Sequence, residues 1–156
     1  MQHSSSSNSS TGKDSDMADS KSIRTITLEG AQRALAAAQR KAEDIGVPMC
    51  MAVCDVGGNL VATIRMDGAP LIPLEVSRDK AWTVAGFNGL PTKLWWSLIG
   101  DQPELVHGLV KVPRLMPFGG GVPLRVDGEL VGAIGVSGGS SEEDHVCATA
   151  GAAALS

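Results

Sequence analysis

Tyrosine is absent from this 156-residue chain, and its aromatic side chains are limited to three tryptophans and two phenylalanines. The core therefore has to be built mainly from Ala, Val, Leu, Ile and Met, which bury less area per residue than aromatic rings do. The apolar fraction of 43% still suits a folded protein. The length fits one ordinary domain better than two. We expect a single domain over residues 23–156.

Charge is also scarce. Only 19% of the residues are charged, and the formal net charge is -4. A nucleic-acid partner requires clustered Lys and Arg against the phosphates, so this balance argues against one. A low charged fraction also suits a surface partly covered by copies of the same chain. No apolar run is long enough to span a bilayer, so we expect no membrane partner.

The chain contains three cysteines, an odd number that does not describe a disulfide framework. On one predicted strand, Cys50 and Cys54 would stand roughly 13 Å apart, too far to share a metal ion. Zinc-type C-x-x-C spacing is absent. Together with Cys147 they are interpreted as reduced core thiols, which favours the cytoplasm, and no metal site is predicted.

Residues 1–22 form a serine-rich polar run without the apolar segment that a signal peptide needs. Their composition predicts a disordered leader. Either the leader is native, or it is a cloning remnant, or Met17 is an internal start.

Four helices are expected from periodicity and end signals. In the first, over 27–45, apolar residues recur at three- and four-residue steps, with Thr27 as N-cap and Gly46 as a left-handed C-cap. The other helices are predicted over 72–87, 92–99 and 142–155.

Strands are predicted over 49–55, 60–66, 122–126 and 129–137, with one or two more within 106–116. The first is apolar on both faces and therefore central. Asp127-Gly128 is a hairpin signal of the primed type. The order of hairpins and helices predicts an α+β domain with an antiparallel sheet.

Two glycine-rich loops fit neither G-x-G-x-x-G nor the P-loop, so no nucleotide site is predicted. One is Gly119-Gly120-Gly121. The other leads into the last helix, whose acidic first turn complements the helix dipole and repels phosphate. The interpretation there is a capping box of Ser140 with Glu143, or of Ser141 with Asp144.

Charged residues in otherwise apolar stretches form a candidate polar set. Lys80 lies in an apolar helical segment, where it is either partly buried with a carboxylate partner or extended along the surface. Among the histidines, His107 and His145 are either ligands or ordinary surface residues. The set comprises Arg65, Asp67, Lys80, Glu142 and Asp144.

Several motifs, taken in their order along the chain, resemble those of a known family. They are MAVCDVGGNL at 51–60, RMDGA at 65–69, KA at 80–81, FGGGVPL at 118–124, DGELVGAIGVSG at 127–138 and EED at 142–144. Across residues 25–155 the chain resembles the GlcG/HbpS family, also called the haem-degrading or DUF336 domain.

The resemblance implies profilin-like α-β-α layers with a five-stranded antiparallel sheet, in a homo-oligomer that is often an octamer. Members include a haem-binding, haem-degrading sensor protein and the C-terminal domain of PduO-type corrinoid adenosyltransferases, so haem is the implied cofactor. No position matches an axial haem ligand by motif. The candidates with suitable donors are His107, Met116 and His145.

Three functions stay open at this point. The first is a haem-binding or other small-ligand-binding protein with a crevice near a subunit boundary. The second is a cofactor-independent isomerase, lyase or hydrolase of small-molecule metabolism, and the third is a structural accessory to a larger complex. In the enzyme, Lys80 or Arg65 would hold an oxyanion and Asp67 or Asp144 would move a proton. The predicted ligand-binding residues are Gly119, Gly120, Gly121, Phe118 and Glu142, with Trp82, Trp95 and Trp96 as further walls.

Overall fold

Local sequence signals set both ends of the first helix. The computed structural model describes residues 18–156, and in it α1 (Leu28–Ile45) follows Thr27, whose side chain accepts the Gly30 N–H. The helix ends at Gly46, which has a left-handed φ of 74°. Both predicted caps are confirmed. Of the leader predicted to be disordered (residues 1–22), residues 1–17 lie outside the described residues.

The strands pair into one antiparallel sheet with the order β2-β1-β4-β3. The hairpin residues Asp127 and Gly128 have φ values of 52° and 76°, as the predicted primed turn requires. The elements are β1 (Cys50–Asp55), β2 (Leu60–Arg65), α2 (Ile72–Gly86), η1 (Thr92–Leu94), α3 (Trp95–Ile99), α4 (Pro103–Leu109), β3 (Gly121–Val126), β4 (Glu129–Ser137) and α5 (Ser141–Ala153).

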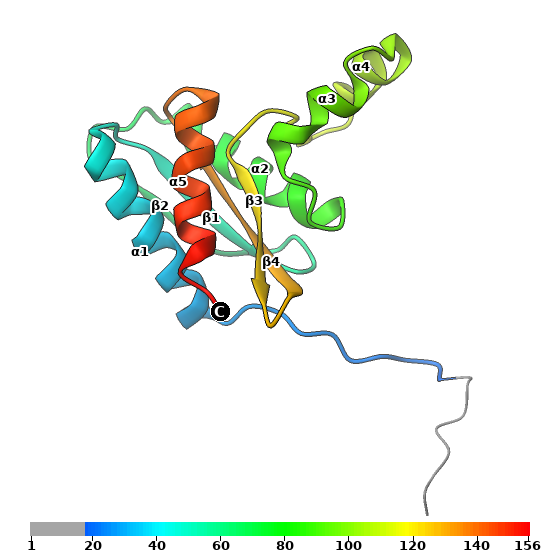
Figure 1. Ribbon diagram of the computed structural model, residues 1–156, viewed down its shortest axis with the longest axis horizontal. Coiled ribbons are helices and arrows are strands. Elements are labelled where there is room, and N and C mark those ends of the chain that lie inside the picture. Colours follow the sequence, from blue (N-terminus) through cyan, green and yellow to red (C-terminus); the bar gives the residue numbers. More distant parts are fainter. Residues whose placement is uncertain (1–17) are drawn as a thin grey trace, which may run out of the picture.

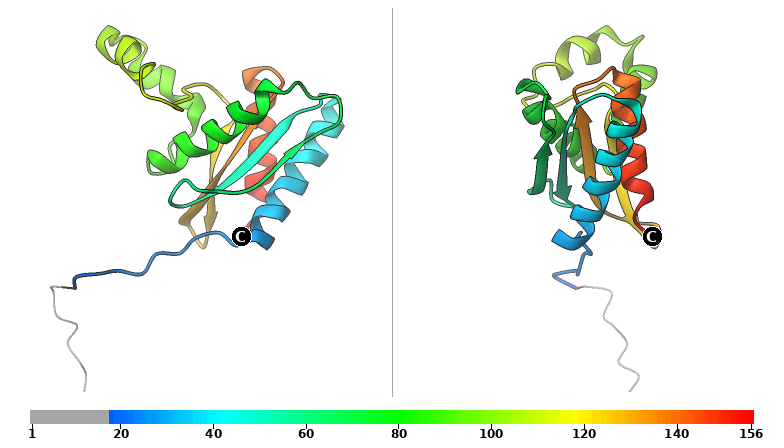
Figure 2. Two further views of the ribbon diagram at one scale, coloured as in Figure 1. Left: turned by 180° about the vertical axis from the view of Figure 1, so that it is seen from behind. Right: turned by 90° about the vertical axis from the view of Figure 1, so that its left-hand side faces the viewer.

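Helices cover both faces of the sheet (Figures 1 and 2). On one face, α1 and α5 pack on Met51, Val53 and Ile134, which belong to the main hydrophobic core. On the other face lies α2, so close to β4 that a Cβ atom at Gly135 would collide with the Ser77 carbonyl oxygen. Small residues therefore permit the layered arrangement that the family resemblance implied. The predicted capping box of Ser140 with Glu143 is present at the start of α5.

Two predictions about the sheet are wrong. The sheet has four strands rather than five, and the strands predicted within 106–116 are replaced by α4 and the turns after it. Pro103 at the helix start and Glu104 in its first turn are helix signals that the apolar run after them obscured. Because α4 buries none of its residues, apolar content here did not indicate a core strand.

Residues 92–112 form an arm that projects away from the layers (Figure 1). It comprises η1, α3 and α4, and it leaves several large apolar side chains in solvent, namely Leu94, Trp96, Leu98, Leu105, Val110 and Val112. Within residues 18–156, no helix has both the length and the apolar character that a bilayer crossing demands.

Candidate functional site

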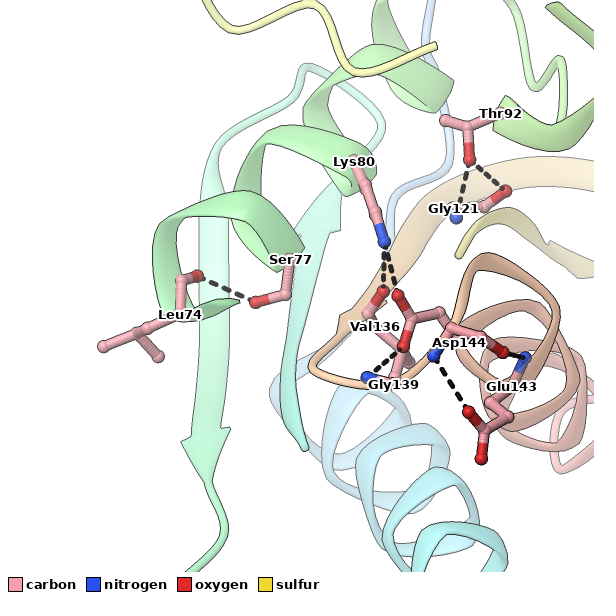
Figure 3. Close-up of polar contacts among 10 residues, drawn as sticks. Leu74, Ser77, Lys80, Thr92, Gly121, Val136, Gly139, Glu143 and Asp144 are labelled. Carbon is pink, nitrogen blue, oxygen red and sulfur yellow. Dashed lines mark hydrogen bonds and ion pairs between the residues drawn. The ribbon is translucent and has the colours of Figure 1, made fainter. Parts of the chain in front are cut away.

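Lys80 and Asp144 form a buried ion pair at one end of the sheet (Figure 3). Lys80 Nζ donates to Asp144 Oδ2 at 2.8 Å and to the Val136 carbonyl oxygen at 2.9 Å. The other carboxylate oxygen of Asp144 accepts the Gly139 N–H at 2.9 Å. Because Lys80 comes from α2 and Asp144 from α5, the pair joins the two helical layers across the end of the sheet.

Burial dominates the electrostatics of this pair. Removal from water lowers the pKa of Lys80, while the hydrogen bond and charge of Asp144 oppose that change. Burial likewise raises the pKa of Asp144, against the opposing effect of Lys80. Each charge is therefore tolerated only because the other is present.

The triple-glycine loop closes over the pair. Gly120 has a φ of 127°, and a Cβ atom there would contact the Val136 carbonyl oxygen and lie 2.7 Å from Lys80 Nζ. The Phe118 ring centroid lies 4.8 Å from the same nitrogen. The Gly121 N–H already donates to Thr92 Oγ1 at 2.8 Å, so this amide is occupied. The ammonium is thus enclosed by carboxylate, carbonyl, ring and loop.

Other members of the predicted polar set lie elsewhere. Arg65, Asp67 and Glu142 are exposed, and among the ion pairs of residues 18–156 none joins them to Lys80 or Asp144. Arg65 stands opposite Cys50 in the sheet register. The structure therefore brings together Lys80, Asp144, Phe118 and residues 119–121, and leaves the other three in solvent.

The three haem-ligand candidates have different surroundings. His107 is exposed on α4. His145 is half-buried on α5, where burial lowers its pKa, and its Nδ1 has no hydrogen-bond partner in the described part of the chain. Met116 lies against a groove beside α2.

This groove, which we call the α2 groove, has a volume of about 490 Å³. Its rim is strongly exposed, since Leu71 and Ile72 keep 68% and 78% of their surface in solvent. Apolar side chains make up most of the lining, with Glu75 and Asp79 as the charged members. The residues are Leu71, Ile72, Leu74, Glu75, Val76, Asp79 and Met116.

Comparison with known proteins agrees with the motifs. Residues 26–153 match the family described as "Haem degrading protein HbpS-like". The chain belongs to the HbpS-like family. The predicted resemblance to the GlcG/HbpS family is thereby confirmed.

Relatives share the fold along nearly the whole HbpS-like domain. An uncharacterised 15.0 kDa protein of Citrobacter freundii is 36% identical over 129 residues, covering 83% of this chain and 91% of the relative. The crystal structure of Klebsiella pneumoniae ORFY superposes with a TM-score of 0.83 at 33% identity, covering 90% of this chain and 97% of that one. The structure of PduOC in complex with haem gives a TM-score of 0.74 at 28% identity, covering 84% and 95%.

No local pattern predicts one pair of residues beside the α2 groove of this HbpS-like chain. Arg114 Nε donates to Asp79 Oδ1 at 2.8 Å, and its guanidinium lies 4.8 Å from the Trp82 ring centroid. Arg114 also has an unusual φ of 70°. The two partners are 35 residues apart, so no local spacing rule connects them. The pair fixes the segment that carries Met116 against α2.

Proposed function

We propose that this HbpS-like chain binds a flat, largely apolar small ligand, with haem as the cofactor, in the α2 groove. The observation that carries the proposal is the groove itself: a volume of about 490 Å³ whose walls are mainly aliphatic and include a methionine thioether. Pockets for small molecules are mostly apolar with few polar groups. The α2 groove has that composition.

The residues present fit haem in two respects. The aliphatic walls suit the porphyrin faces, and Met116 offers a soft sulfur donor of a kind found in haem proteins. Of the charged groups, Glu75 and Asp79 do not attract propionates, whereas Arg114, which pairs with Asp79, is a cation beside them. Bound haem would supply a redox-active iron, with Met116 as our proposed ligand and Arg114 as the proposed partner of a propionate.

A hemin titration of the purified full-length protein tests this proposal. We expect a Soret band that saturates with hemin, together with a shift of that band in Met116→Leu, which keeps the side-chain volume but removes the thioether. His107→Ala and His145→Ala, which remove the other two candidate donors, are the matched controls and should leave the Soret band unchanged.

Two outcomes count against parts of the proposal. A flat titration at micromolar protein would overturn haem binding altogether. An unchanged spectrum in Met116→Leu, with loss of the band in His107→Ala or His145→Ala, would keep haem binding and move the ligand away from the groove.

We also propose that the chain is a homo-oligomer, an octamer by family resemblance. Support comes from the arm, which exposes several large apolar side chains, among them Trp96 and Val110 with 66% and 68% of their surface in solvent. Exposed apolar surface that is gathered on one part of a protein marks interaction sites. Trp96→Ser should lower the mass measured by light scattering. Leu28→Ser, on an exposed apolar residue of α1, is the control and should leave it unchanged. The buried, unpaired state of the three cysteines supports a cytoplasmic location as part of this proposal.

A further inference from the structure

The two edges of the sheet differ in how far they are open to another strand. On one edge, β3 is interrupted by Pro123 and by a register shift between Leu124 and Arg125. Its Gly121 N–H donates to Thr92 Oγ1 at 2.8 Å, so the start of this edge is also occupied. Proline, bulges and covering segments keep an edge strand from pairing with another chain. The β3 edge is therefore protected.

The opposite edge, formed by β2, is open along most of its length (Figure 1). A register shift between Val53 and Cys54 leaves Val61 as a bulge near the start of β2. Beyond this bulge the strand is regular and contains neither proline nor lysine. Pairing with β1 continues one residue past β2, because the Met66 N–H donates to the Met49 carbonyl oxygen at 3.0 Å. Residues 62–66 therefore form a regular edge, which we call the β2 edge.

The hydrogen bond of Met66 shows which backbone groups of the β2 edge are free. In an antiparallel ladder, residues that exchange hydrogen bonds with the neighbouring strand alternate with residues that do not. Ala62, Ile64 and Met66 are therefore bonded to β1, and Thr63 and Arg65 direct their backbone N–H and C=O groups away from the sheet. Both of these residues are exposed. Their outward backbone groups form a template for one further strand.

The surface beside the β2 edge suits a copy of the same strand. A groove of about 250 Å³ lies between α1 and β2, and no charged side chain of the described residues lines it. On a two-fold axis each group meets its own copy, so a charge at the centre would face a like charge, which is destabilising. The lining includes Gln32, Ala36 and Gln39 of α1 and Ala62, Thr63 and Ile64 of β2.

We propose that the β2 edge pairs with the β2 edge of a second copy of this chain, antiparallel and centred on Ile64. In this register Thr63 of each copy faces Arg65 of the other, so the outward backbone groups exchange hydrogen bonds. The side chains of Ala62, Ile64 and Met66, which pack against the main core, form one apolar row across the axis. The two sheets become one. This inference rests on the proposed homo-oligomer, but the arm contributes no residue to it.

An exchange of charge at the axis tests the pairing. Ile64→Lys and Ile64→Glu each place two like charges on the axis, so either full-length variant alone should give roughly half the wild-type mass in light scattering. An equimolar mixture of the two should recover the wild-type mass, because opposite charges then meet. Leu28→Lys and Leu28→Glu, at an exposed apolar position of α1 outside the groove, are the matched controls and should leave the mass unchanged.

Cysteine variants test the register. Ile64→Cys places two thiols opposite each other at a non-hydrogen-bonded pair, where the Cα atoms stand about 4.5 Å apart, within the range that a disulfide bridges. Mild oxidation should therefore give a covalent dimer on a non-reducing denaturing gel. Thr63→Cys, one residue off the axis and on the other face of the sheet, is the matched control and should give far less. The native cysteines are buried and should not compete.

Three results would each overturn the proposal: an unchanged mass in both charge variants of Ile64, no recovery of mass in their mixture, or a covalent dimer with Thr63→Cys but not with Ile64→Cys. The cross-link does not require the charge variants to fold. Trp96→Ser should retain the Ile64→Cys cross-link. If Trp96→Ser alone lowers the mass, the homo-oligomer stands and the β2 pairing falls, whereas a monomeric wild type overturns both. Hemin titration should not change in Ile64→Glu, because Ile64 lies outside the α2 groove.

Discussion

One helix serves two opposite environments in this protein. From α2, Lys80 extends into a closed cluster where carboxylate, carbonyl, ring and glycine loop surround its ammonium. From the same helix, Ile72 and Val76 line an open groove. The charged pair, which the sequence suggests as a catalytic pair, is closed off from solvent and joins two helical layers. The apolar α2 groove is open to solvent. Buried charge therefore serves the fold in this protein, and the open apolar surface is the better place to seek ligands.

Removal of one partner of the buried Lys80–Asp144 pair should have the largest effect on stability. Lys80→Met should lower the free energy of unfolding by about 3–5 kcal/mol, because it leaves the Asp144 carboxylate buried without its counter-charge. Urea unfolding monitored by circular dichroism measures the loss. If the lysine instead served only chemistry, stability would change little.

The double variant Lys80→Met/Asp144→Leu is the matched control. With both charged groups removed, no uncompensated charge remains in the cluster, and most of the lost stability should return. A double variant as unstable as the single one would mean that the Val136 and Gly139 hydrogen bonds, rather than the charge pair, hold the layers together.

The glycine loop over the pair offers a smaller effect. Gly120→Ala should destabilise the protein by about 3 kcal/mol, because it places a Cβ atom against the Val136 carbonyl oxygen and Lys80 Nζ at a φ that L-residues rarely adopt. Gly86→Ala, at the open end of α2, should instead be neutral or stabilising by about 0.5 kcal/mol. Equal effects in thermal melts would contradict the contrast between a sealed region and an open one.

Most of the fold could be predicted from the sequence because its signals are local. Thr27, Gly46 and Asp127-Gly128 fix element ends through caps and a turn that depend on a few adjacent residues. The strands predicted within 106–116, in and after the arm, were wrong because local signals there were misleading. Val106, Leu109 and Val110 look like core residues, but within residues 18–156 the first two are only half-buried and Val110 is exposed. Apolar content alone does not distinguish a core strand from a helix at the surface.

The candidate site was predictable only where local chemistry constrained it. A lysine among apolar helix residues has to find a carboxylate if it is buried, and Asp144 was in the predicted set. Pairings such as Arg114 with Asp79 depend on how distant segments meet, and no spacing rule gives them. Arg65 and Asp67 show the converse, because conspicuous charges at a strand end point into solvent.

The smallest expected effect is a pH dependence at His145, which follows Asp144 on α5 at the edge of the sealed cluster. Burial, assisted by the charge of Lys93 and opposed by that of Glu142, lowers the pKa of His145 below its ordinary 6.5. The unfolded chain then binds this proton more readily than the folded one, so stability present above pH 6.5 is lost as the pH falls toward the folded pKa. Unfolding midpoints at pH 7.5 and 5.5 should differ more in the wild type than in His145→Gln.

Asp144, whose pKa burial raises, acts in the opposite direction, but it is common to both proteins and drops out of the comparison. His107→Gln, which changes an exposed histidine, should retain the wild-type difference, and an equal difference in all three proteins would show that His145 does not titrate with folding.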